Sequence, residues 1–480
     1  MSSPSPSRRT LAAAVLALVC VVLGVAYLPW GPSTENDTDP DDDPVEESWA
    51  FYEERPYYQR PRPPTEVPEG LPDMRAETCG GCHQDIYEEW RISTHRRAYL
   101  DDAQFLAELE KSRSENNPDS DDDVGWMCVN CHTPMMNQLD ELVVGLEDGD
   151  VGQPIYRDNP HFDEKMQEEA ITCATCHVRD GTVYGPYGDT DAPHPTARDP
   201  NLRDESACTD CHQAEHEWPE RNLGCYFTTG EEFAGSTHSE TEETCQSCHM
   251  PEVERKLAEG FDRPKRKTRR HWFGGSLIPK HPDFEEELEP LQEVYGSGVT
   301  IDLIEPEGDE PTGEADPDYH ESSTNCADGD DCTSLWVRLD NEHAGHNFPT
   351  GDPERHAIIE ATATDADGEQ VAHATDLIGS RYKWWPDIEK LTDNRIASGE
   401  THDVALDVPL VDGVEIEIVA HKYRMFEEAV EHHDLEGEYV RGRKFHESRW
   451  KVDEDGTPSL IEISDDWGER DTLEPDATQN

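Results

Sequence analysis

The chain has 480 residues, of which 108 are acidic and 40 basic, giving a formal net charge of -68 at pH 7, and only 34% of it is hydrophobic. A surface this negative repels phosphate groups and excludes nucleic acid as a partner. The repulsion between its negative charges also destabilises a compact fold in dilute buffer. At molar salt the Debye length falls to about 3 Å and this repulsion is screened. We therefore expect either a halophilic protein or an acidic protein with a docking face for a basic partner.

The amino terminus has the pattern of a signal anchor. Arg8 and Arg9 precede an unbroken apolar run from Leu11 to Leu28, which reaches the lower length limit for crossing a bilayer. We expect residues 1–30 to form an uncleaved single-pass helix in the cell membrane, with a cleaved signal peptide as the alternative. Both place the rest of the chain on the extracytoplasmic (periplasmic) side, because the positive flank stays inside. Residues 31–72, rich in Asp and Pro, are predicted to be a solvated tether.

Five Cys-x-x-Cys pairs lie between residues 73 and 290, and each is followed directly by His. In chain order, the first to fifth motifs are Cys79/Cys82/His83, Cys128/Cys131/His132, Cys173/Cys176/His177, Cys208/Cys211/His212 and Cys245/Cys248/His249. This is the spacing of covalent haem c attachment, in which the thiols bind the porphyrin and the histidine ligates the iron. A zinc ribbon or a redox dithiol does not need that histidine, and five pairs leave one zinc half-site unmatched. The sequence therefore predicts five covalently attached haem c groups in a pentahaem cytochrome domain over residues 73–290.

The spacing of the motifs and the pattern that follows them predict an α+β fold. The first cysteines of successive motifs are 49, 45, 35 and 37 residues apart, which leaves room for one or two short helices and loops per haem, and no strand pattern is evident there. Four later segments alternate or run apolar over strand lengths, with the turns ADG and VDG between them: SLWVRLDNE, HAIIEATATD, THDVALDVPL and EIEIVAHKYRMF. We predict a mainly α or irregular multihaem domain wrapped around five haems, a small antiparallel β-sandwich-like domain over residues 325–425, and a helical or irregular tail over 426–480, in addition to the N-terminal membrane helix.

Three cysteines after residue 200 lie outside the motifs. Cys326 and Cys332 flank an acidic turn at the start of the β region. In an exported protein they are expected to form a disulfide, with two free thiols as the alternative. Cys225 has no evident mate and is expected to be a buried thiol.

Iron held by one histidine has a second axial position, and 17 histidines remain to fill it. The sequence context of five of them predicts distal ligation: His95, His194, His238, His271 and His346. His95 and His238 both end an S-T-H string with an aromatic residue upstream, and His271 precedes Trp-Phe-Gly-Gly, whose glycines allow the backbone to approach a flat ring closely. His346 lies in the turn GHNFPTG, and His194 lies between two prolines. The reserve candidates are His161, His216, Met135 and Met136.

The order CxxCH-x3-Tyr-x2-Trp-x2-Ser-x-His, read from Cys79 to His95, resembles the cytochrome c-554-type multihaem cytochromes, which are related to hydroxylamine oxidoreductase and octahaem tetrathionate reductase. The string CQSCHMP at the fifth motif, His271 with its glycines and the GHNFPTG segment are similar to members of the same group. The resemblance covers about residues 73–351. It implies closely stacked haem pairs and the same five distal histidines. The c-554 type carries four haems, so the fifth motif and the long carboxy-terminal β region depart from it.

Two functional classes follow from this sequence. Five motifs and five candidate distal histidines leave no open iron, which favours a membrane-anchored electron carrier that passes electrons between the membrane and extracytoplasmic redox partners through bis-His haems. A membrane quinol or a cytochrome complex is a candidate partner, and no catalytic side chain is assigned. The alternative is a multihaem oxidoreductase acting on a small nitrogen or sulfur compound at one five-coordinate haem. The basic run from Arg263 to Arg270 is expected to hold haem propionates, to receive an acidic partner, or to be a solvated loop.

Overall fold

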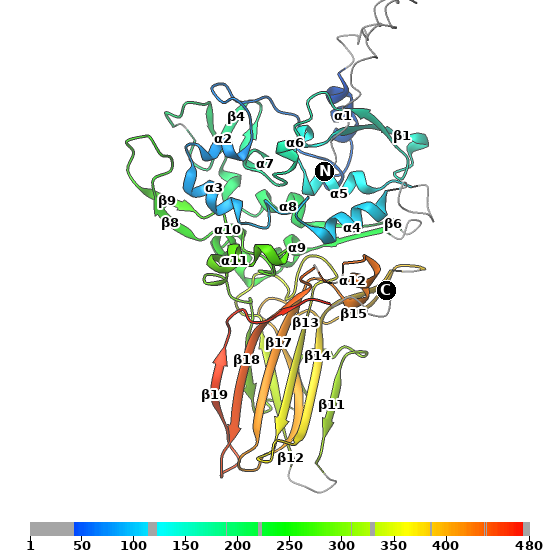
Figure 1. Cartoon of the computed structure of the whole chain (residues 1–480), viewed down its shortest axis with the longest axis vertical. Helices are drawn as coiled ribbons and strands as arrows, with labels where there is room; N and C mark the ends of the chain where they lie inside the picture. The colour runs from blue at the N-terminus through cyan, green and yellow to red at the C-terminus, as the bar shows by residue number, and fades with distance from the viewer. Residues whose placement is uncertain are drawn as a thin grey trace, which may run out of the picture. The chain divides into compact units, whose positions relative to one another are not determined.

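Short helices and small sheets make up the chain from residue 44 to about 292 (Figure 1). The computed structural model describes residues 43–113, 122–188, 190–218, 223–308, 310–326, 332–384, 386–435, 437 and 439–473. The helices are α1 (Pro44–Glu53), α2 (Ala76–Gly80), α3 (Gln84–Arg91), α4 (Ala103–Ser112), α5 (Gly125–His132), α6 (Glu164–Gln167), α7 (Cys173–His177), α8 (Ser206–His212), α9 (Thr229–Ala234), α10 (Cys245–His249) and α11 (Glu285–Gln292). The strands are β1 (Glu141–Leu146), β2 (Pro154–Asp158), β3 (Val178–Arg179), β4 (Thr182–Gly185), β5 (Thr196–Arg198), β6 (Ala214–Trp218), β7 (Leu223–Phe227), β8 (Glu252–Arg255) and β9 (Arg266–Arg269).

This motif-bearing region has little apolar core of its own. Its largest cluster of buried apolar residues has nine members, contributed mainly by α4, α5 and the segment that follows α5. The region after residue 298 instead has one cluster of 24 buried residues. Helices this short cannot bury enough side-chain surface against one another to be stable alone. Large apolar macrocycles attached at the five motifs would supply the missing buried surface.

Two antiparallel sheets form the rest of the described chain. Their strands are β10 (Thr300–Ile304), β11 (Glu321–Thr324), β12 (Cys332–Asp340), β13 (His356–Thr364), β14 (Gln370–Lys383), β15 (Glu389–Asp393), β16 (Thr401–Pro409), β17 (Glu415–Tyr423), β18 (Gly442–Val452), β19 (Pro458–Ser464) and β20 (Arg470–Asp471), with helix α12 (Glu427–His432) before β18. One sheet has the order β10-β12-β16, and the other has the order β11-β14-β13-β17-β18-β19, with β15 paired to β14 and β20 to β18. The long strands β13, β14, β17 and β18 lie side by side (Figure 1).

The apolar core of this region comes from side chains that alternate along the strands. On β13, Ala357, Ile359, Ala361 and Ala363 are fully buried, while the residues between them are not. Together with alternate residues of β10, β12, β14, β16 and β17 they form the 24-member cluster between the two sheets. A period of two residues is what a strand with one buried face requires. Cys326 and Cys332 form a disulfide at the start of β12.

The predicted fold class needs correction in three respects. Strand, at 31% of the chain, exceeds helix, at 25%, and strands occur between the motifs, where strands such as β3 and β4 are too short to show an alternation pattern. The β region is not small, because β10 precedes residue 325 and β18 and β19 follow residue 425, where a tail was expected. The membrane helix expected over residues 11–28 lies outside the described residues. Within the described ranges, no helix is both long and apolar enough to cross a bilayer, so the fold class stands without that helix.

Candidate haem sites

Each motif places its two cysteines and its histidine on one side of a helical turn. Residues i, i+3 and i+4 share a helix face, which is why the x-x spacing and the directly following His suit attachment to one flat group. Helices α5, α7, α8 and α10 all end at the motif histidine. In the first motif the turn is completed by a hydrogen bond from the His83 amide to the Cys79 carbonyl at 2.9 Å, and α3 begins at the next residue.

The imidazole rings of four motif histidines are oriented by backbone carbonyls. The ring Nδ1 atoms lie at hydrogen-bonding distance from the carbonyl oxygens of Leu257 for His83 (2.8 Å), Ala98 for His132, Tyr184 for His177 (2.7 Å) and Gly274 for His249. A carbonyl can only accept, so in each ring Nδ1 carries the proton and Nε2 keeps its lone pair. A lone pair held in a fixed direction is what an iron ligand needs.

Three predicted distal histidines lie opposite motif histidines. The ring centres are 6.3 Å apart for His95 and His212, 6.2 Å for His177 and His271, and 6.2 Å for His249 and His346. With metal–nitrogen bonds of about 2 Å, two imidazoles on opposite faces of one metal ion have their ring centres roughly 6 Å apart. His271 and His346 also hydrogen-bond through Nδ1 to backbone carbonyls, at 3.0 and 2.9 Å. Burial lowers the pKa of His95 and of His271 to about 3, which keeps both rings neutral and able to ligate.

The first motif has His194 as its neighbour. Burial lowers the pKa of His83, and the charge of His194 lowers it further, so His194 lies within electrostatic range of the first motif. The His194 ring Nδ1 lies 3.3 Å from the carbonyl of Pro195.

His238 does not face a motif histidine. Its Nδ1 lies 2.7 Å from the Glu243 carboxylate and its Nε2 lies 3.2 Å from the Glu342 carbonyl, so both ring nitrogens are occupied. The S-T-H string folds here as the 3-10 helix η6 (Thr237–Glu240). The chain around Gly345 packs against the Cβ atom of His238 and the ring of Phe233, and it carries His346 to the fifth motif instead.

The second motif lacks an imidazole partner in the described part of the chain. Its His132 ring stacks on Phe105, with ring centres 3.7 Å apart and planes inclined by 10°. The reserve candidates do not supply a ligand at this position: His161 is exposed, His216 stacks on Tyr58, and Met135 and Met136 lie in separate apolar clusters.

A buried glutamate on α3 holds the segment that carries His271. Glu89 accepts hydrogen bonds from Arg255 and Arg270, both at 2.7 Å, and from the His271 amide at 3.0 Å. Phe273, two residues on, packs its ring 4.3 Å from the ring centre of His95. The same segment therefore fixes the positions of two predicted distal ligands. The sequence did not single out Glu89, because nothing local distinguishes it from the exposed Glu88 beside it on the same helix.

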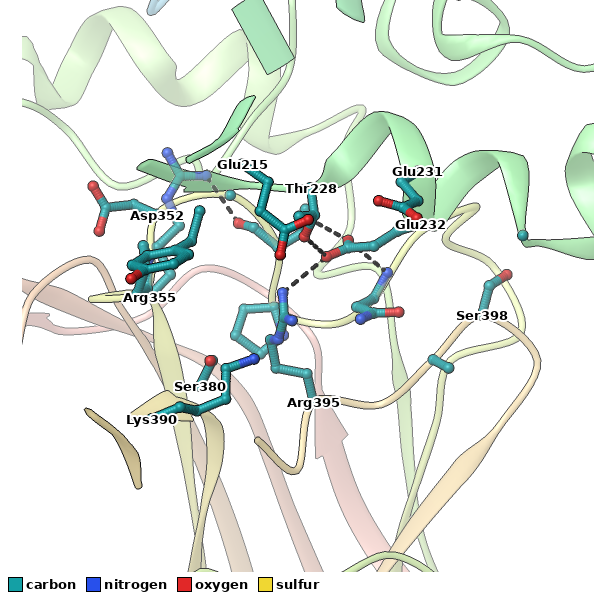
Figure 2. A pocket seen from close by; sticks show the side chains of 18 of the residues that line it. Glu215, Thr228, Glu231, Glu232, Asp352, Arg355, Ser380, Lys390, Arg395 and Ser398 are labelled. Atoms are coloured by element: carbon teal, nitrogen blue, oxygen red, sulfur yellow. Dashed lines mark hydrogen bonds and ion pairs between the residues drawn. The ribbon is translucent and has the colours of Figure 1, made fainter. Parts of the chain in front are cut away.

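A second buried carboxylate, Glu232 on α9, fixes the loop that carries His346 (Figure 2). It accepts hydrogen bonds from Thr228 (2.9 Å), Thr350 (2.6 Å), the Asn347 amide (3.2 Å) and Arg395 (2.8 Å). Three of these donors come from the β region and one comes from the loop before α9. Glu232 thereby joins the two parts of the chain at the point where the β region presents His346.

Attachment cysteines of different motifs lie near one another. Their thiols shift one another's pKa between the first motif and the third, the second and the fourth, and the fourth and the fifth: Cys79 with Cys173, Cys131 with Cys211, and Cys208 with Cys245. Cys176 of the third motif lies near Cys211 of the fourth, with Arg62 beside both. The five attachment sites therefore form one connected network in which the fourth is the branching point.

The residues present fit haem c. Each motif supplies two thiols and an imidazole, and three motif histidines face a second imidazole at the spacing of a shared iron. Four guanidiniums have a buried N–H group without a hydrogen-bond partner among the described residues, and two of them lie near the motifs, Arg266 near His83 and Arg424 near Asp102. Such orphan donors suit the carboxylates of haem propionates.

Comparisons with known proteins support the multihaem interpretation. Residues 78–151 match the family model described as cytochrome c554 and c-prime. The fold is similar to that of a penta-haem cytochrome c552 from Thermochromatium tepidum, with a TM-score of 0.50 and 17% identity over 86% of this chain and 100% of that one. The chain is a multihaem c-type cytochrome. No relative is found among curated proteins. A multihaem c-type cytochrome uses haem c as its cofactor and transfers electrons.

A buried cluster of charges in this cytochrome surrounds the second motif. Lys280 bonds to Asp102, and Arg424 lies 3.5 Å from the same carboxylate. Burial alone would raise the pKa of Asp102, but the charges of Lys280 and Arg424 reverse this effect and hold it below its ordinary value. Burial, and then the charge of Asp352, raises the pKa of Glu108 to about 8. The cluster joins residues separated by more than 300 positions, so no local sequence pattern could have revealed it.

Proposed function

We propose that the cytochrome is an electron carrier with five covalently attached haem c groups, four of them held by two histidines each. The pairs are His83 with His194, His95 with His212, His177 with His271, and His249 with His346. The observation that carries the proposal is the 6.2–6.3 Å spacing of three of these pairs. Two strong axial ligands leave no position for a substrate and favour electron transfer over binding of small molecules.

The contacts between attachment cysteines support a continuous route. When bound, haem c supplies reversible one-electron chemistry at each site. The chain sets the spacing of these sites, because thiols of successive sites on the route lie near enough to shift one another's pKa. Electrons delivered at the first site would pass by way of the third to the fourth, and from there to the second or the fifth.

A sharp test is the count and coordination of the haems. A fully matured sample should give five haems per chain in a pyridine haemochrome assay, and its oxidised spectrum should show four low-spin haems and one that is not bis-His. Three or fewer haems in matured protein would contradict the assignment of the motifs. If all five haems were low-spin and bis-His, the assignment of the second motif as the one without a second histidine would be wrong.

The acidic composition and the disulfide support an extracytoplasmic protein that works at high salt. Disulfides such as Cys326–Cys332 persist in oxidising compartments. A net charge of -68 is best tolerated where salt screens it. The partners we propose are redox proteins on that side of the membrane, including a quinol-oxidising or cytochrome complex. Protease treatment of spheroplasts should degrade the haem-stained band, and full protection inside intact spheroplasts would contradict this location.

The second motif supports another candidate function, an oxidoreductase acting on a small nitrogen or sulfur compound. His132 has no second imidazole among the described residues, so an iron there would keep an axial position free. Burial, together with the charge of Asp352, raises the pKa of Glu108 to about 8 and that of Glu354 to about 7. Carboxyl groups that hold a proton near neutral pH are suited to supply one to a bound substrate.

A cavity of about 490 Å³ approaches this region and is lined by Asp352 and Arg355 (Figure 2). Carbon monoxide or nitrite added to the reduced or oxidised protein should perturb one haem in five, and turnover of nitrite or hydroxylamine with an artificial electron donor would favour the enzyme. Ligand binding without turnover would favour the carrier.

A further inference from the structure

One hairpin concentrates positive charge in this strongly acidic cytochrome. Strands β8 and β9 pair from Glu252 with Arg269 to Arg255 with Arg266, and they present the loop between them to solvent (Figure 1). Three of the chain's 11 lysines lie within this short hairpin, together with an exposed arginine: Lys256, Arg263, Lys265 and Lys267. The whole chain has 108 acidic and 40 basic residues, whereas residues 252–269 have four acidic residues (Glu252, Glu254, Glu259 and Asp262) and seven basic ones, so the hairpin differs sharply in charge from the average surface.

The basic run splits into side chains that support the fold and side chains that face solvent. Arg270 bonds to the buried Glu89, and Arg269 donates to the carbonyls of Gln246 and Met250. The outward group has weaker attachments. Lys267 pairs with Glu252 at 2.9 Å and Arg263 with Asp191 at 2.7 Å, in both cases between exposed side chains.

Exposed pairs of this kind are weak and exchange readily with another anion. Lys256 and Lys265 have no ion-pair partner among the residues that the structure describes. The four outward cations, Lys256, Arg263, Lys265 and Lys267, are therefore available to a partner.

The same hairpin touches the first attachment motif. The carbonyl of Leu257 accepts from the His83 ring at 2.8 Å, and the amide of Glu259 donates to the carbonyl of Cys82 at 2.7 Å. The first motif also lies at one end of this network of cysteines. Among the described residues, the attachment cysteines of the first motif are near those of the third motif only. A partner bound on the hairpin would lie next to a terminal site of the electron route.

We propose that the loop between β8 and β9, residues 256–267, docks an acidic electron-transfer protein that exchanges electrons with the haem of the first motif. The proposal rests on the carrier function. One electron passes from the reduced centre of the partner to the ferric iron, and no bond forms or breaks. Charge complementarity selects the partner class, because four exposed cations at one end of the route would attract a negative surface and speed encounter.

The test compares two triple variants of the matured cytochrome. The first is Arg263→Gln, Lys265→Gln and Lys267→Gln on the hairpin. The matched control is Lys383→Gln, Arg449→Gln and Lys451→Gln, which removes the same charge from exposed, acid-paired positions of the β region. None of the six side chains contacts a motif histidine, and the backbone bonds to the first motif are unaffected.

The probe is a photoreduced, acidic plant-type [2Fe–2S] ferredoxin, used at the lowest salt that leaves the melting temperature unchanged. We expect the second-order rate of haem reduction to fall about tenfold in the hairpin variant and to stay near that of the unmodified protein in the control. Both variants should be reduced at the same rate by an uncharged deazaflavin radical, which needs no docking surface.

Equal rates with ferredoxin in the two variants would overturn the docking site while leaving the carrier function intact. The docking site would also be overturned if the hairpin variant lost self-association, or binding to anionic lipid vesicles, while its rate of reduction by ferredoxin stayed unchanged. Failure of the deazaflavin to reduce the haems of the unmodified protein would overturn the carrier function itself.

Discussion

Replacing Glu232 by Gln tests whether one buried carboxylate holds the β region against the motif-bearing region. The Glu232 side chain is 7% exposed and accepts four hydrogen bonds, two from hydroxyls, one from an amide and one from the Arg395 guanidinium. A hydrogen bond to a charged group contributes about 1.5–3 kcal/mol. A Gln side chain keeps one acceptor oxygen, and Arg395 keeps its two bonds to Asp393. The free energy of unfolding should therefore fall by about 2–4 kcal/mol, which is less than the sum over all four hydrogen bonds.

The assay has two readouts, the melting temperature and the haem spin state. A loss of this size should lower the melting temperature by roughly 2–4 °C in a unit of this length. Loosening the loop that carries His346 should also raise the high-spin fraction of one haem in five. The matched control is Glu231→Gln on the same helix, since the Glu231 carboxylate is exposed and has no partner among the described residues. Equal melting temperatures and spectra for the two variants would refute the reasoning.

Three further predictions follow from particular residues. His346→Ala should convert one low-spin haem to high spin and leave the rest unchanged, whereas His238→Ala should change none, as checked by electron paramagnetic resonance. The raised pKa of Glu108 (about 8, against 4.5 unperturbed) means that the folded chain holds a proton that the unfolded chain releases, so stability should fall as pH rises from about 5 to 8. Glu108→Gln should flatten that fall in a melting-temperature series, and Glu110→Gln on the exposed face of α4 should not. The melting temperature of the unmodified protein should rise between dilute buffer and molar KCl, and a flat response would remove the halophilic explanation of the -68 charge.

The attachment motifs could be identified from sequence because their geometry is local. Two thiols and an imidazole within five residues define a site whatever the rest of the chain does. The pairing of distal histidines is not local. His95 follows the first motif by twelve residues but faces His212 of the fourth, and His346 comes from the β region. Sequence context selected both residues, but only the tertiary fold assigns them to a motif.

The S-T-H string illustrates how a correct pattern can mislead. His95 and His238 share the same local sequence, yet the His95 ring lies opposite His212 whereas the His238 ring lies between the Glu243 carboxylate and the Glu342 carbonyl. The difference comes from Gly345 and its neighbours, which pack against the Cβ atom of His238 and are more than 100 residues away in sequence. A motif selects a residue type and a turn, while the neighbours that decide its role come from elsewhere.

The strands missed by sequence analysis carry buried charge. Strand β18 reads GRKFHESRWKV and has no simple alternation, because Arg443 is buried in an ion pair with Glu285 of α11 and His446 is buried beside Asp465. Charged residues count as exposed in any pattern based on hydropathy. Here a partner from another part of the chain compensates their burial, and that partner is visible only in three dimensions.

The same contacts show that the β region is part of the haem-binding unit and not an appendage to it. It supplies His346 to the fifth motif, Arg395 to Glu232, and Arg424 to Asp102 near the second motif. Removing it would leave the buried Glu232 carboxylate without its cation, at the usual penalty of about 3–5 kcal/mol for breaking a buried ion pair. It would also leave Asp102 with Lys280 alone and His249 without its facing ring. We therefore expect that a chain ending before β10 loses its native structure first around the second and fifth motifs. The first and third motifs should be affected least, because their contacts lie within residues 44–292.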